Sequence, residues 1–170
     1  MTRFRVLPGS SSVDTEVRSS VHPIHGQATE LRGVIEAVFD GDGRPLLDQP
    51  HSGWVEVPVE AIRSGNRFTE IEMQRRADVR RYPTIRFQLD RAWRVDGGDR
   101  YRAALSVTAH GRTHPIEEDF SLRRDGRRLV LEGRHTFDMR DFGVNPPRIL
   151  TLKVDPQVDV RVRLVADEED

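Results

Sequence analysis

The chain has 170 residues, which is enough for one hydrophobic core and predicts a single domain spanning residues 1–170. Twenty-seven basic and 28 acidic residues leave a formal net charge of −1, so no overall positive field would collect nucleic acid. The absence of cysteine excludes disulfides and thiolate metal sites.

Alternation of apolar and polar residues with a period of two runs through much of the sequence and predicts β-strands with one apolar face. In the clearest example, residues 158–164, Val158, Val160 and Val162 alternate with charged side chains. In chain order the predicted strands cover residues 4–7, 13–18, 31–40, 54–60, 84–90, 101–109, 116–124, 128–137, 149–154 and 158–164.

Turns rich in glycine and aspartate separate several of these strands, at residues 40–43, 96–99 and 124–126, and predict antiparallel neighbours. Many strands with one apolar face and little helix are typical of either a β-sandwich or a closed barrel, and periodicity alone does not decide between them. A barrel of about eight such strands would enclose packed side chains or one slender ligand.

One segment, residues 66–80, departs from the strand pattern. It is rich in helix formers, begins at a potential capping asparagine and stops before a Tyr-Pro pair, so it predicts a short α-helix that covers one end of the sheet. The predicted apolar stripe of this helix is Phe68, Ile71 and Val79. The acidic tail, residues 167–170, is predicted to fray in water.

Four short motifs follow one another along the chain. They are Ser-Gly-Asn at residues 64–66, a Tyr-Pro strand entry within residues 81–87, a His-Gly-x-Thr-x-Pro hairpin within residues 105–116 and a compressed Arg-Asp-Phe-Gly motif within residues 139–144. In this order and spacing they resemble the YceI-like family of polyisoprenoid-binding proteins, over nearly the whole chain. The first third matches more loosely, with Thr15 where the family usually has an aromatic residue.

The resemblance implies an all-β fold, an extended lipocalin-like antiparallel β-barrel of about eight strands with one short α-helix. It also implies an elongated apolar tunnel that binds an isoprenoid or another long-chain amphiphilic lipid. Such a carrier is not an enzyme and uses no cofactor. The sequence contains neither a signal-peptide core nor a membrane span, so we expect a cytoplasmic protein.

The residues expected to line the tunnel alternate along four of the predicted strands. The same residues would fill a solid core equally well, because a lipid tail and a neighbouring leucine offer a valine methyl group the same environment. The family resemblance favours the tunnel. The candidate tunnel residues are Val55, Val57, Val59, Ile85, Phe87, Leu89, Leu105, Val107, Val160 and Val162.

Two histidine pairs have the spacing of metal ligands, His22 with His25 and His110 with His114. A metal site needs three or four converging ligands, and these pairs lie in turn-rich segments far apart in sequence. We therefore predict turn histidines and no metal, with His110 stabilising its own hairpin.

Charged residues lie near the predicted helix and within the motif at residues 139–144, and each group could bind a ligand or have a structural role. The four arginines within residues 75–81 could meet a phosphate head group, but acidic neighbours on the same segment favour a solvated face. Arg140 and Asp141 are predicted to pair across one end of the barrel.

The sequence offers no nucleophile motif or phosphate-binding loop, and the adjacent acids Glu117 and Glu118 point to opposite faces of a strand. Two alternatives to the lipid carrier stay open, neither of which involves nucleic acid. One is a filled barrel that acts as a scaffold or stress-related protein through its surface or a homodimer interface, and it predicts no cavity. The other is a small enzyme for a hydrophobic substrate, which requires converging polar residues inside the barrel.

Overall fold

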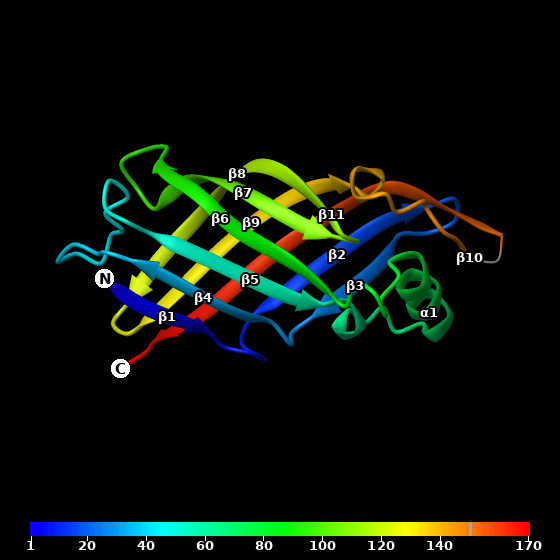
Figure 1. The fold of residues 1–170 in the computed structure, drawn as a ribbon, viewed down its shortest axis with the longest axis horizontal. Coiled ribbons are helices and arrows are strands. Elements are labelled where there is room, and N and C mark those ends of the chain that lie inside the picture. The colour runs from blue at the N-terminus through cyan, green and yellow to red at the C-terminus, as the bar shows by residue number, and fades with distance from the viewer. Residues whose placement is uncertain (150) are drawn as a thin grey trace.

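The computed structural model describes residues 1–149 and 151–170, and within these ranges it contains eleven strands, one α-helix and two 3-10 turns. Antiparallel pairing joins the strands throughout (Figure 1). In chain order the elements are β1 (Thr2–Val6), β2 (Ser12–Ser19), β3 (Ile24–Ala28), β4 (Arg32–Ala37), β5 (Ser52–Pro58), η1 (Val59–Ala61), α1 (Arg67–Arg76), β6 (Thr84–Arg94), β7 (Arg100–Ala109), β8 (Arg112–Asp125), β9 (Arg128–Asp138), η2 (Met139–Phe142), β10 (Arg148–Ile149) and β11 (Leu152–Glu168).

Eight strands close into a barrel in the order β1-β4-β5-β6-β7-β8-β9-β11, because β11 pairs back with β1. The choice between a sandwich and a barrel is therefore decided in favour of the barrel implied by the family resemblance. Strands β2 and β3 are additional: they continue the sheet from β11 and extend the wall toward α1 (Figure 1).

Most predicted strands are confirmed, with shifted ends. Strand β3 was not predicted, and Val59, expected in a strand, begins the 3-10 turn η1. The strand predicted at residues 149–154 includes residue 150, which lies outside the described residues. At the two ends of this predicted strand the structure has β10 and the start of β11. The prediction of a frayed acidic tail is wrong, because Glu168 pairs with Phe4 in the β1–β11 ladder and the backbone N–H of Glu169 donates to Arg3 O.

The end of the barrel that carries both termini is filled. Phe4 and Tyr101 are almost completely buried there, and the rings of Phe4 and Phe39 meet edge to face with 5.5 Å between their centroids. The guanidinium of Arg124 lies 4.9 Å from the Phe39 ring centroid and 5.3 Å from that of Phe4, and it forms a 2.8 Å ion pair with Glu168. An aromatic pair capped by a paired cation therefore closes this end.

Helix α1 covers the opposite end of the barrel (Figure 1). It begins where the side chain of Asn66 accepts a hydrogen bond from the Thr69 N–H, as a capping residue does. The predicted apolar stripe is wrong, because Phe68 and Ile71 are exposed while Thr69 is buried toward the barrel. The inner face of α1 lies over a cavity and carries both polar and apolar side chains, among them Thr69 and Met73. Among the described residues, no helix combines the length and the apolar character that crossing a membrane would require.

Ion pairs hold the filled end together across three strands. Arg3 of β1 pairs with Glu36 of β4 at 2.6 Å and with Glu169, just after β11, at 2.7 Å. Arg5 also pairs with Glu169. Hydrogen bonds from Arg5 and Arg3 lower the pKa of the Glu169 carboxyl below its ordinary value. The chain end is thus fixed to the barrel by charge as well as by backbone pairing.

We expect Glu169→Gln to lower stability at neutral pH and to lower it less in acid. A carboxyl whose pKa is lowered by folding stabilises the fold above its unfolded pKa, ordinarily 4.5 for glutamate, and loses that contribution as pH falls through the folded value. Thermal unfolding of both proteins at neutral pH and at about pH 3 measures this difference. A melting difference of the same size at both pH values would contradict it.

The turn between β7 and β8 depends on a glycine. Gly111 has a φ of +71°, and a Cβ at this position would lie 2.7 Å from Cε1 of Tyr82. Tyr82 in turn packs against the ring of His110 with 5.2 Å between the ring centroids. Both the backbone conformation and the space therefore require glycine here.

We expect Gly111→Ala to destabilise the protein markedly more than Gly65→Ala. Gly65 also has a positive φ of +79°, but a Cβ there would have no neighbouring atom within 4 Å, so that variant isolates the backbone cost of roughly 1 kcal/mol. Gly111→Ala adds the collision with Tyr82, and its cost should be about twice as large or more. Chemical denaturation of the two variants gives the comparison, and equal losses would show that the contact with Tyr82 is unimportant.

Candidate functional site

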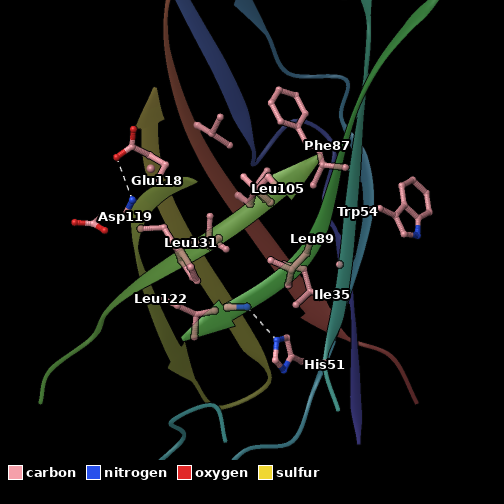
Figure 2. Close-up of a pocket in the computed structure, with 18 of the residues that line it drawn as sticks. Ile35, His51, Trp54, Phe87, Leu89, Leu105, Glu118, Asp119, Leu122 and Leu131 are labelled. Atoms are coloured by element: carbon pink, nitrogen blue, oxygen red, sulfur yellow. Dashed lines mark hydrogen bonds between the residues drawn. The ribbon is translucent and has the colours of Figure 1, made fainter. Parts of the chain in front are cut away.

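Two apolar cavities occupy the interior of the barrel. The first, shown in Figure 2, has a volume of about 180 Å³, and the second, which α1 covers, has a volume of about 230 Å³. Aliphatic and aromatic side chains make up most of both linings. The barrel is therefore hollow between its filled end and α1.

All ten candidate tunnel residues border one cavity or the other. Alternation along the strands turns these residues inward and their neighbours outward. Trp54, which precedes Val55 on β5, shows the outward position, because its ring points away from the cavity (Figure 2). The guanidinium of Arg86 lies 4.7 Å from the centroid of the Trp54 ring. The first cavity is lined by Val55, Leu89, Leu105 and Val162, the second by Val57, Val59, Ile85 and Val107, and both by Phe87 and Val160.

A constriction separates the two cavities. Four residues line both, and two of them, Phe87 of β6 and Phe137 of β9, meet across the barrel edge to face with 6.3 Å between their ring centroids. The other two are Val13 and Val160 on the paired strands β2 and β11. The cavities therefore adjoin at this point.

Several lining residues were not among the candidates. Phe137 and Leu131 follow the alternation of β9, but Gly133 and His135 on the same face weaken its apolar pattern. Met73 of α1 lines the second cavity on the helix face opposite the predicted stripe. The alternation could have identified the first two, whereas no local pattern indicated Met73.

The barrel wall is open between β8 and β9 beside the first cavity. The register of these two strands ends at Phe120 and Gly133, although both strands continue and keep pairing with their other neighbours. A 2.8 Å contact between His135 Nδ1 and Glu118 Oε2 bridges the gap, and the same carboxyl accepts a hydrogen bond from the Asp119 N–H (Figure 2). Glu118 and His135 border both the apolar cavity and a polar groove outside.

Two further histidines, His110 and His114, have structural contacts. His110 Nδ1 lies 2.9 Å from the carbonyl oxygen of Phe142, so it ties its hairpin to η2 instead of acting within the hairpin alone. The predicted pairing of Arg140 with Asp141 is wrong: Arg140 pairs with Asp138 at 2.7 Å, and Asp141 lies 3.6 Å from His114. Across residues 1–149 and 151–170, no three His, Asp or Glu side chains gather in a way that could hold a metal ion.

Solved structures with the same architecture cover nearly the whole chain. BcnA of Burkholderia cenocepacia aligns with a TM-score of 0.78 and 17% identity, over 94% of this chain and 98% of that one. A polyisoprenoid-binding domain from Saccharophagus degradans aligns with a TM-score of 0.77 and 10% identity, over 98% of both chains. The YceI protein of Campylobacter jejuni aligns with a TM-score of 0.68 and 14% identity, over 85% of both. At these identities the likeness shows a shared fold.

The sequence comparisons identify the family. No curated protein matches the chain significantly. The profile of the YceI-like domain, however, matches residues 4–166. Because this match spans the closed barrel and both additional strands, the chain belongs to the YceI-like domain family.

Proposed function

We propose that the protein is a non-enzymatic carrier that holds one long apolar lipid, of isoprenoid type, in its two adjoining cavities. The observation that carries this proposal is the pair of apolar cavities inside a closed barrel. Membership of the YceI-like family and the shared fold with a polyisoprenoid-binding domain support the same ligand class. The ten residues of the candidate tunnel are proposed to contact the lipid.

Energetics favour an occupied interior. An unfilled apolar cavity costs about 24 cal/mol per Å³, so each of these cavities would cost on the order of 5 kcal/mol if nothing filled it. The total stability of a domain is only about 5–15 kcal/mol. A lipid tail that enters both cavities would offset this cost and leave water at the same time.

The shape of the interior favours a slender chain. The cavities adjoin at the contact between Phe87 and Phe137, which a linear prenyl or acyl chain passes more easily than a fused-ring lipid. The gap between β8 and β9, bordered by Glu118 and His135, offers hydrogen-bonding groups to a polar head. The tail would supply affinity, and the head would remain near water.

The polar groups beside the cavities support binding without catalysis. Among the described residues, His51 Nε2 accepts a hydrogen bond from the Ala92 N–H, His110 contacts the Phe142 carbonyl, and His135 contacts Glu118. Each of these rings is thus engaged in holding strands and turns together. A hydrophobic-substrate enzyme would instead need such groups to converge on one point of the cavity.

Native mass spectrometry of gently purified protein, followed by solvent extraction and identification of the lipid by mass, tests the proposal. We expect one long-chain isoprenoid per chain. If the mass equals that of the bare chain, and added quinones or prenyl lipids neither bind nor raise the melting temperature, the carrier function is excluded. A surface-acting scaffold would then take its place.

Filling the first cavity should block the ligand. Val162→Phe places an aromatic ring into this cavity, whereas Arg163→Phe adds the same ring to the outer face of the same strand, where Arg163 is half exposed. We expect Val162→Phe to lose bound lipid and at least about tenfold in affinity for added prenyl lipid, while Arg163→Phe keeps both. Circular dichroism shows whether each variant is folded. Full lipid occupancy in folded Val162→Phe would place the ligand elsewhere.

A further inference from the structure

The outer face of α1 exposes two large apolar side chains. Phe68 is 75% exposed and Ile71 is 51% exposed, and their spacing of three residues places them next to each other on the helix. On the inner face, Thr69 and Met73 line the second cavity. The width of one helix therefore separates this outward-facing pair, the α1 patch, from the apolar interior.

A further apolar side chain lies at the same end of the molecule. Val21, in the turn between β2 and β3, is 72% exposed. Strand β2 leads into this turn, and its last residue, Ser19, pairs with Val154 near the start of β11. Helix α1 contacts β10, which pairs with the start of β11, so α1 and the β2–β3 turn share one end of the barrel (Figure 1).

The segment that carries the α1 patch has a net positive charge. Residues 63–81 carry six arginines and three carboxylates, in a chain whose total charge is −1. Glu72 pairs with two of these arginines, whereas none of the ion pairs among the described residues involves Arg67 or Arg80. At the opposite end, the loop at residues 40–48 carries three aspartates and one arginine. The α1 end is therefore the more positive one.

We propose that the α1 patch docks the protein on an anionic lipid membrane. Apolar side chains on a helix enter the boundary between head groups and acyl chains, and surrounding arginines contact lipid phosphates. The patch combines both features on the element that covers the second cavity. This surface goes beyond lipid binding inside the barrel, because docking requires no cargo.

Charge and area favour a membrane over another protein as the partner. A stable protein interface buries roughly 800 Å² on each side, which two adjacent side chains do not supply. A second copy would also bring two arginine-rich segments together, and like charges oppose that contact. An anionic membrane needs only a few inserted side chains, and each nearby arginine adds to the attraction.

Sedimentation with vesicles tests the docking. The vesicles are phosphatidylcholine alone or phosphatidylcholine with about one third phosphatidylglycerol. We expect the wild-type protein to bind the anionic vesicles and to lose binding as salt is raised. Phe68→Ser combined with Ile71→Ser, and separately Arg67→Gln combined with Arg80→Gln, should each lower binding at least about tenfold.

Two further variants make the result specific. Val95→Ser removes an apolar side chain that is 47% exposed in the β6–β7 turn at the other end, and it should bind as the wild type does. Val162→Phe, which blocks the first cavity, should also bind normally, so docking and cargo binding can fail separately. If Val162→Phe loses vesicle binding while the α1 variants keep it, the protein binds vesicles by taking lipid into its cavity. That result would overturn the docking proposal.

Three other outcomes would overturn it. The first is a wild-type protein that binds neither kind of vesicle. The second is a loss in Val95→Ser equal to that of the double serine variant at α1. The third is a wild-type dimer in solution that the double serine variant converts to a monomer, because the α1 patch would then be a self-association surface.

Discussion

Strand β11 must satisfy backbone hydrogen bonds along both of its edges over 17 residues, and the rest of the structure depends on how it does so. Strand β9 covers one edge from Asp138 to Arg128. Two strands share the other edge: β2 pairs with its first part and β1 with its last three paired residues. The same strand thus closes the barrel at one end and extends its wall at the other.

This division gives the barrel two different ends. Where β1 closes the ring, Phe4, Phe39 and Arg124 fill the interior and the terminal ion pairs seal it. Where β2 and β3 extend the wall, no comparable plug is present in the described residues, and α1 lies across the opening with Thr69 and Met73 toward the cavity. The two apolar cavities lie between these two ends.

The apolar interior and the charged exterior have separate roles in the proposed function. In that proposal, the contact of Phe87 with Phe137 selects for a slender chain, and Glu118 and His135 border the polar gap beside the first cavity. The exterior has almost no net charge, yet its arginines and aspartates are unevenly distributed between the two ends. Total charge alone therefore says little about which surface a partner would meet.

By itself, the sequence determined which face of each long strand turns inward, since a period of two in a strand is set by local backbone geometry. For this reason the nine candidate tunnel residues that lie in strands border a cavity, and Val59, at the start of η1, borders the second cavity as well. Tertiary structure decided what local patterns do not encode: the meeting of Phe87 with Phe137, the bridge from Glu118 to His135, and the inner face of α1. Each depends on which distant element lies opposite, and that is fixed by closure of the sheet through β11.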